Sequence, residues 1–455
     1  MPRNDSVTAI LDVEPHIAHR SSNPVSEEPF NILVVGAFSG VQPKSGRAPV
    51  EIDRDNFDSV VARFAPELKL EIAGRPLHLK FGDLDDFHPD ALHRRIGLFG
   101  EIEETMTARP QARAASSNPP PAGSGESEVD AGILDRILAD LPEPANGRPA
   151  NVSLADATDL RGFIDRVLAS YVSPKESSEQ ADRRQRRQAI KSELMRAILH
   201  ARPYQALEAA WRGVWFLVRR IETGPNLKIF IADAGAGDSS LPDPPADKQW
   251  SVIILDRGFR DSEESLQALS QAGRQAMRWN AALLAESEPP ARLSPTDAED
   301  SRTRWSLFRK TPEAAHIGLA LPRLIARMPY GQSGETTDEF RFEEMASAPQ
   351  HSDYLWMNPA FGLGYLLAAA FEREGWRMTP GAVRDIEGMP LHVYREEGES
   401  VAKPCAELLL HEKDVEELLD AGIMPLASIR DTDRVRLVRF QSIAEPARAL
   451  AGPWD

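Results

Sequence analysis

Cysteine is nearly absent from the sequence, in which Cys405 is the single thiol. One cysteine cannot build a disulfide scaffold or a cysteine-rich metal centre, and such low usage is typical of a reducing compartment. Cys405 follows a proline and precedes the apolar residues AELLL. We therefore interpret it as a buried structural thiol.

Positive charge is also in short supply. The 53 lysines and arginines are outnumbered by 70 aspartates and glutamates, which gives a formal net charge of −17. This charge disfavours nucleic acid and anionic membrane surfaces as partners. The basic run Arg183, Arg184, Arg186 and Arg187 lies in a helical pattern beside acidic residues. We interpret it as a solvated helix face rather than as a phosphate-binding patch.

Long hydrophobic runs are few, and the N-terminus lacks an apolar stretch of signal-peptide length. The run YLWMNPAFGLGYLLAAAF at 354–371 is uncharged and comes near the length that spans a membrane. However, it contains Asn358, Pro359 and two glycines, and charged residues close both of its ends. We predict a buried helix after a proline start, no membrane insertion, and a cytoplasmic location.

Motifs for catalysis are scarce as well. GAFSGVQPKS follows an apolar strand pattern and invites comparison with a phosphate-binding loop, but Pro43 precedes Lys44 and has no backbone amide to offer a phosphate. The sequence contains no GxSxG motif, and no set of serine, histidine and acid can be selected. We expect no catalytic residues, no cofactor and no enzymatic activity.

One acidic stretch, FGDLDDFHPDALH, keeps a metal-dependent enzyme open as an alternative. Its titratable residues are Asp83, Asp85, Asp86, His88, Asp90 and His93. Carboxylates and imidazoles at this density can hold a divalent cation, but the spacing of a calcium loop is absent and the two histidines are five residues apart. Acidic residues at a helix start also complement the helix dipole without any metal. We therefore expect no metal site.

The predicted fold class is α/β, with α+β mixed sheets and flanking helices. FNILVVGAFSG is typical of a buried strand. A helix with Asp55 as its N-cap is predicted from apolar residues at helical spacing, which are Phe57, Val60, Val61 and Phe64. LKLEI and LHLKF predict two strands around the turn AGRP, and a helix begins at Pro89. Together these elements predict a first module, 1–106.

The stretch 107–130 is rich in Pro, Ala, Ser and Gly and predicts a flexible linker. A second module, 131–455, begins with amphipathic helices around 131–141, 153–173 and 176–201. YQALEAAWRGVWFLVRRIE predicts a strongly apolar helix, LKIFIAD and WSVIILD predict strands, and 261–285 predicts a helix that leads into a polar linker at 286–304. Further strands are predicted for LHVYREE, CAELLLHE and VRLVRF.

Several of these stretches resemble one family. VEIDRDNFDSVVARFAPEL and LKFGDLDDFHPDAL resemble the small subunit of the contractile sheath of type VI secretion systems. YQALEAAWRGVWFLVRRIETGPNLKI, HIGLALPRLIARMPYG and DYLWMNPAFGLGYLLAAAF resemble the large sheath subunit, and AGIMPLASIRDTDRVRLVRFQSI resembles its later part. The motifs stand in the family's order and cover most of 7–106 and 131–445. The resemblance implies a structural building block of a contractile injection apparatus.

The sequence departs from the family pattern in two ways. The family supplies the two subunits as separate chains, whereas here the linker at 107–130 joins them, and the resemblance to the large subunit stops near the end of the sequence. We expect a fused sheath-like protein with a truncated large-subunit part. A non-polymerising accessory that caps, seeds or regulates a sheath is the alternative. The implied partners are other sheath protomers, while contacts with an inner tube, a baseplate and a disassembly ATPase are left open.

Two groups of residues are candidates for interfaces. In VTAILDVE, at 7–14, one face of an expected strand carries Val7, Ala9, Leu11 and Val13, and the resemblance implies that such a strand is donated to a neighbouring protomer. In IGLALPRLIARMPYGQ, at 317–332, a helix would place Arg323 and Arg327 on one side. Their guanidinium groups suit carboxylates of the same or of an adjacent protomer. An interface role and a core helix with internally paired arginines both remain open.

Overall fold

The computed structural model describes residues 28–40, 48–107, 179–235, 240–288, 298–332, 334–345, 349–396 and 398–454. These residues form a mixed α/β structure around a nine-stranded sheet, which confirms the predicted fold class. The strands of this sheet are β1 (Phe30–Gly36), β2 (Val50–Ile52), β5 (Leu227–Asp233), β6 (Val252–Phe259), β7 (Ala282–Ser287), β8 (Ile317–Leu321), β11 (Asp385–Ile386), β14 (Ile423–Ser428) and β15 (Val435–Leu437).

The strands lie in the order β11-β15-β14-β8-β7-β6-β1-β5-β2. The six strands from β14 to β5 are parallel to one another, and β15, β11 and β2 add antiparallel pairs at the two margins. β1 is buried along its whole length, with Ile32 and Val34 in one hydrophobic cluster and Leu33 and Val35 in another. Parallel strands that are apolar on both faces need a cover on both faces.

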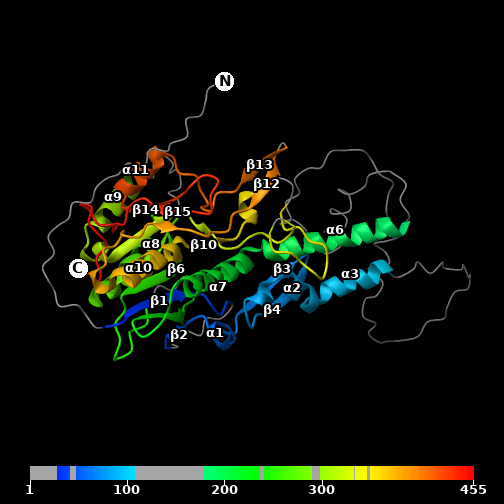
Figure 1. Cartoon of the computed structure of the whole chain (residues 1–455), viewed down its shortest axis with the longest axis horizontal. Helices are drawn as coiled ribbons and strands as arrows, with labels where there is room; N and C mark the ends of the chain where they lie inside the picture. Colours follow the sequence, from blue (N-terminus) through cyan, green and yellow to red (C-terminus); the bar gives the residue numbers. More distant parts are fainter. Residues whose placement is uncertain are drawn as a thin grey trace, which may run out of the picture.

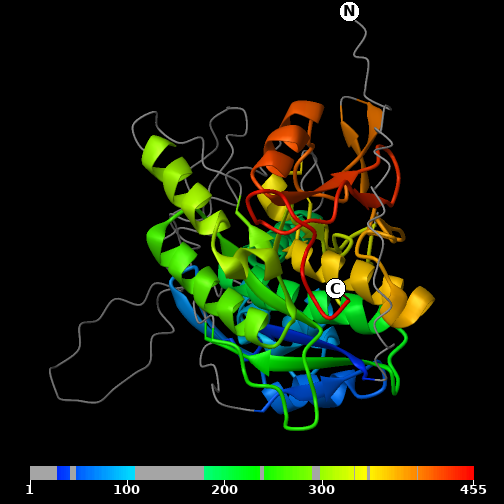
Figure 2. The same ribbon diagram turned by 90° about the vertical axis from the view of Figure 1, so that its left-hand side faces the viewer.

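Helices supply that cover (Figures 1 and 2). The described helices are α1 (Phe57–Phe64), α2 (Pro89–Arg95), α3 (Gly97–Thr107), α6 (Glu179–Leu199), α7 (Arg202–Arg220), α8 (Glu263–Arg278), α9 (Ala298–Arg309), α10 (Pro359–Glu374) and α11 (Glu412–Asp420). α10 packs on β6, β7 and β8 from one side and against α7, whereas α8 packs on β6 and β7 and its buried residues belong to the other hydrophobic cluster. The sheet is therefore the middle layer of three.

Three small antiparallel pairs surround the main sheet. They are β3 (Glu67–Ile72) with β4 (Arg75–Lys80), β9 (Leu324–Ile325) with β10 (Trp356–Met357), and β12 (Val393–Glu396) with β13 (Glu399–Ala402). The first pair lies beside α2, α3 and α6 at one end of the molecule (Figure 1). The main sheet and α8 to α11 occupy the other end.

Several local predictions are confirmed. α1 buries the four apolar residues that defined its face, although its N-cap is Asn56 rather than Asp55. β3 and β4 flank the predicted turn, and α2 begins at Pro89. α10 begins at Pro359, with the Asn358 side chain accepting a hydrogen bond from the backbone N–H of Ala360. None of the helices in the described ranges is long and apolar enough to cross a membrane.

Other local predictions are wrong. The helix predicted over 261–285 ends at Arg278, because Asn280 adopts a positive φ of 52° and the chain turns into β7 at Ala282. The predicted polar linker 286–304 includes the end of β7 and the start of α9. CAELLLHE is not a strand: Ala406 forms one isolated bridge with Leu324, and α11 begins at Glu412.

The segment 317–332 is also not a helix. Its apolar run forms β8, which lies between β7 and β14 and is buried at every residue. A five-residue apolar run suits a strand in the middle of a sheet, and this location overrides its helical spacing. The predicted strand 7–14, the linker 107–130 beyond its first residue, and the helices at 131–141 and 153–173 lie outside the described residues.

Candidate functional site: the joint between two segments

The described residues before and after the predicted linker meet along β1. We call 28–107 the N-terminal segment and 179–454 the C-terminal segment. β1 belongs to the N-terminal segment, yet it pairs with β5 on one side and with β6 on the other, with Phe30 opposite Leu227 and Ile32 opposite Val252. One segment therefore supplies an internal strand to the sheet of the other. The division into modules 1–106 and 131–455 stays a prediction.

Beside the strand pairing, α7 of the C-terminal segment makes two buried side-chain hydrogen bonds to the N-terminal segment. The Trp211 indole N–H donates to the carbonyl oxygen of Phe38 at 3.0 Å, and its ring packs edge-on against Phe57 and Phe64. About two helical turns closer to the start of α7, the Tyr204 hydroxyl donates to the carbonyl oxygen of Phe87 at 2.7 Å. Both side chains are fully buried, and burial raises the pKa of Tyr204 well above its usual value. Each polar tip therefore has a partner across the joint.

A loop at 334–345, which we call the clasp, runs over the N-terminal segment. The backbone N–H groups of Asp338 and Glu339 donate to the two carboxylate oxygens of Asp90, at 2.9 and 3.1 Å. Glu339 also accepts from Arg94 at 2.9 Å, and Phe340 stacks on the ring of His93. The clasp is therefore bound to α2, which we call the base of the clasp.

The other side of the clasp rests on α6. Gln188 donates to the carbonyl oxygen of Arg341, and Arg196 donates to the carbonyl oxygens of Glu343 and Glu344. α6 also reaches the N-terminal segment directly, since the ammonium group of Lys191 donates to Glu103 and lies 3.2 Å from His93 Nε2. α2, the clasp and α6 therefore form one polar seam.

A buried charge network centred on Arg327 includes Glu344 of the clasp. Arg327 Nη1 and Nη2 donate to the two carboxylate oxygens of Glu344, at 2.7 and 2.9 Å, and Nε donates to Glu208 Oε1 at 2.8 Å. Arg212 donates to the same oxygen of Glu208 at 2.7 Å and to the Tyr330 hydroxyl at 3.0 Å. The side chains of Arg327, Glu208 and Glu344 are at most 5% exposed. Two arginines and two glutamates balance each other in charge.

In this network, ion pairing outweighs the effect of burial on the pKa values of Glu344 and Arg327. Burial alone would raise the pKa of Glu344, but the charge of Arg327, with hydrogen bonds from His200 and Arg327, lowers it to about 2. Burial likewise opposes the charge on Arg327, yet Glu208 and Glu344 raise its pKa well above the usual value. Glu344 and Arg327 are therefore both charged at neutral pH, and removing either one leaves the other as a buried charge without full compensation.

Arg323 and Arg327 do not share a face. Arg323 follows the end of β8 and forms a two-pronged bond with Glu407, Nε to Oε2 at 2.8 Å and Nη2 to Oε1 at 2.5 Å. His351 adds a contact to the same carboxylate at 3.0 Å. The side chain of Arg323 is 40% exposed, whereas the guanidinium of Arg327 is enclosed by partners of its own chain. Of the two arginines, Arg323 is the one accessible to another molecule.

The acidic stretch at 83–93 forms local caps and the base of the clasp. Asp83 accepts from the backbone N–H of Asp86, and Asp86 accepts from that of Gly82 and pairs with Arg95 at 2.8 Å. His88 is the N-cap of α2, and burial lowers the pKa of His93. Across the described ranges, no group of three or more metal-binding side chains is placed to hold a metal ion.

Lys44 and Cys405 were also singled out in the sequence. Lys44, from the compared phosphate loop, lies outside the described residues. Cys405 is fully buried, its thiol donates to the carbonyl oxygen of Pro390 at 3.3 Å, and burial raises its pKa to about 11. The interpretation of a buried structural thiol is confirmed.

The sequence interpretation missed Asp90 as the base of the clasp and Glu208 as a partner of Arg327. A signal for Glu208 was present. It stands one helical turn after Tyr204 and one turn before Arg212, on the side of α7 that carries large apolar residues. A carboxylate on an apolar helix face predicts a buried cation as its partner. No comparable pattern identified Asp90, which resembles an ordinary first-turn acid.

Fold and joint together define a structural α/β unit in which buried ion pairs and a shared sheet hold two segments of one chain together. Comparison with known families names this class. Residues 187–238 and 265–444 match the family described as EvpB/VC_A0108, tail sheath N-terminal domain, over just over half of the chain. The chain therefore belongs to the tail sheath family. Residues 11–118 match a second family, described as type VI secretion system, VipA, VC_A0107 or Hcp2.

A curated relative agrees with these matches. The type VI secretion system sheath protein TssC1 of Pseudomonas aeruginosa is 24% identical over 290 residues, which is 55% of this chain and 58% of the relative. The chain thus spans less than two thirds of the length of that relative. A small-subunit match followed by a large-subunit match in one chain confirms the predicted resemblance to a fused sheath protein.

Proposed function

We propose that the chain is a non-enzymatic building block of a contractile injection apparatus of the type VI secretion class, and that it acts in the cytoplasm as a fused pair of sheath subunits. The observation that carries this proposal is the position of β1 between β5 and β6. A strand inside another segment's sheet is a permanent connection, which suits a part that transmits mechanical load. The two family matches in one chain support the same function.

The proposed partners are other sheath protomers. The apolar face formed by Val7, Ala9, Leu11 and Val13 would enter the sheet of a neighbour by strand addition. Arg323 is the second proposed contact, since its half-exposed guanidinium is already oriented by Glu407. Arg327 is not among the proposed contacts, because its guanidinium is bound to Glu208 and Glu344 of the same chain. Contacts with an inner tube, a baseplate and a disassembly ATPase rest on family resemblance alone.

Electron microscopy of the purified full chain, alone and mixed with an intact two-subunit sheath, tests the proposal. Incorporation into helical sheath, or tubes formed by the chain itself, is the expected result for a building block. Small oligomers that bind only at sheath ends would support the capping accessory instead. A chain that neither assembles nor binds sheath would contradict both.

A matched pair of variants locates the proposed contact. Leu11→Asp puts a charge on the apolar face of the predicted strand, whereas Thr8→Asp puts the same charge on the opposite face. We expect Leu11→Asp to abolish binding to sheath and Thr8→Asp to preserve it, with unchanged thermal unfolding of both. Equal binding by the two variants would exclude strand addition through this face.

A further inference from the structure

Lys403 lies beside an aromatic cluster outside the joint. It follows the last residue of β13, and its backbone N–H donates to the carbonyl oxygen of His392 at 2.8 Å. Its Nζ lies 5.0 Å from the centre of the Tyr354 ring and 5.8 Å from that of the Trp356 ring. Within the described ranges, this side chain forms no ion pair with a carboxylate. The ammonium group is therefore surrounded by aromatic rings instead of by negative charge.

His351 is the polar neighbour of this ammonium group. Its Nδ1 lies 3.5 Å from Lys403 Nζ, on the exposed side of the cluster, and its Nε2 lies 3.0 Å from Glu407 Oε1. The imidazole ring stacks on Trp356 with the ring centres 5.1 Å apart, and the Trp356 indole N–H donates to the carbonyl oxygen of His351 at 3.0 Å. These contacts fix the orientation of the imidazole ring.

The partners of His351 determine which of its nitrogens carries the hydrogen. Burial would raise the pKa of Glu407, but the bonds from Arg323 and His351 lower it to about 2. This carboxylate is therefore ionised at neutral pH and can only accept, so His351 Nε2 donates to it. In the neutral imidazole, Nδ1 is then the unprotonated nitrogen, and Nδ1 is the atom beside Lys403 Nζ. A nucleophile, its proton acceptor and the group that orients the acceptor lie in the same order.

Burial also acts on the lysine. It lowers the pKa of Lys403, although the charge of Glu407 opposes this shift. At a given pH, a larger share of this amine is therefore unprotonated than in an exposed lysine, and the unprotonated amine is the nucleophile. Two exposed lysines allow a comparison. Lys310 directly follows α9, and the side chain of Lys413 in α11 is 85% exposed.

We propose that Lys403 is a site of covalent acylation by activated acyl donors, an acyl phosphate or an acyl thioester, with His351 as the proton acceptor. The free amine attacks the carbonyl carbon and forms the N–C bond of an amide. The bond from that carbon to the phosphate oxygen or to the sulfur breaks, and phosphate or thiolate leaves with the electron pair. The proton released by the nitrogen passes to His351 Nδ1. This modification site is independent of the proposed sheath function.

Acylation would change the contacts of Lys403. The amide is neutral, so the rings of Tyr354 and Trp356 lose the cation beside them. The carboxylate of Glu407 keeps its bonds to Arg323 and His351. The modification therefore weakens the contact between the end of β13 and β10 without breaking the neighbouring ion pairs.

Mass spectrometry of the purified full chain tests this site. Brief incubation with acetyl phosphate, and separately with acetyl-CoA, followed by digestion after glutamate, gives the rate of acetylation at each lysine. We expect Lys403 to be acetylated several-fold faster than Lys310 and Lys413, although both of these are more exposed. The donor that produces this preference identifies the source of the acyl group. A rate at Lys403 that is no higher than at the two exposed lysines, with both donors, would overturn the proposal.

A matched pair of histidine variants tests the proton acceptor. His351→Phe removes it, whereas His78→Phe removes another histidine that is paired with a glutamate, on β4. We expect the first variant to slow acetylation of Lys403 several-fold and the second to leave it unchanged. An unchanged rate at Lys403 in folded His351→Phe would contradict the proposed role of His351.

The pH profile of the wild type keeps the test decisive if His351→Phe folds poorly. Because the pKa of Lys403 is lowered, its rate of acetylation should reach a plateau at a lower pH than the rate at Lys310. Parallel profiles at the two lysines would show that Lys403 reacts as an ordinary exposed amine, which would overturn the proposal.

Discussion

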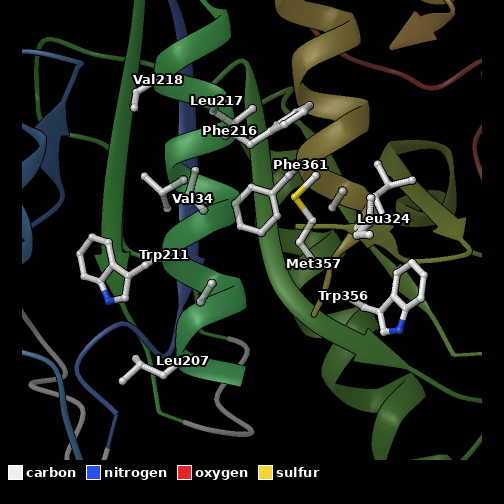
Figure 3. Packing of buried hydrophobic residues seen from close by; sticks show 14 of the residues in the cluster. Val34, Leu207, Trp211, Phe216, Leu217, Val218, Leu324, Trp356, Met357 and Phe361 are labelled. Atoms are coloured by element: carbon white, nitrogen blue, oxygen red, sulfur yellow. The ribbon is translucent and has the colours of Figure 1, made fainter. Parts of the chain in front are cut away.

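Gly213 of α7 lies directly against the ring of Phe361 in α10: a Cβ at position 213 would be 2.3 Å from Phe361 Cε2. Figure 3 shows the Phe361 ring between the two helices, with Leu217 and Met357 nearby. A second glycine, Gly364, allows α10 the same close approach to Ile254 of β6. α7 contacts the N-terminal segment through Trp211 and Tyr204, and α10 covers the sheet, so this contact couples the two.

The first prediction follows from that contact. Gly213→Ala should destabilise the protein by about 1–3 kcal/mol, because the added methyl group would overlap a fully buried ring. Urea unfolding followed by tryptophan fluorescence measures the change. Gly100→Ala in α3 is the control: nothing lies within 4 Å of its Cβ position, and we expect it to be neutral or stabilising by about 0.5–1 kcal/mol. Equal stability of the two variants would contradict the close packing.

The second prediction separates the two arginines. Arg327→Leu should destabilise the protein by about 3–5 kcal/mol, because Glu208 and Glu344 would remain buried without a full partner. Arg323→Leu should cost far less, since its side chain is 40% exposed and Glu407 keeps His351 as a partner. Chemical denaturation of both variants gives the comparison. Similar losses from the two substitutions would disprove the difference in environment.

The third prediction concerns acid. The pKa values of Glu344 and Glu407 are both lowered to about 2, against burial, by Arg327 in the first case and by bonds from Arg323 and His351 in the second. A lowered folded-state pKa contributes stability above the unfolded value of 4.5, and this stability is lost as pH falls from 4.5 toward 2.

Unfolding profiles between pH 2 and 5 check this expectation. Glu407→Gln should start less stable than the wild type at pH 5 and lose less stability on acidification. Glu416→Gln, an exposed residue of α11, should follow the wild-type profile. If Glu407→Gln and wild type lost stability in parallel, the carboxylate of Glu407 would not be held ionised by its partners.

The fourth prediction tests the shared sheet. Proteolytic cleavage within 110–128 should leave the two fragments associated, because β1 is hydrogen-bonded on both sides and its apolar residues lie in both hydrophobic clusters. Size-exclusion chromatography of the cleaved protein, without denaturant, measures this. Fragments that elute separately would show that the linker alone holds the segments together.

Local structure was largely readable from the sequence. The helical spacing of Phe57, Val60, Val61 and Phe64, the proline starts at Pro89 and Pro359, and the turn between β3 and β4 all depend on neighbours within a few residues. Short apolar runs were less certain. IGLAL became a strand and CAELLLHE an irregular segment, because length and composition alone do not decide between buried elements.

The apolar faces, the starts of most elements and the family resemblance can all be read from the order of the amino acids. The contacts between distant residues require the folded chain: β1 lies between β5 and β6, Arg327 binds Glu208 across 119 residues, and Asp90 lies under the clasp. Periodicity predicts that a face will be buried, but it does not predict which residues will pack against that face. A charge on such a face needs an opposite charge, and only the folded chain brings that charge within hydrogen-bonding distance.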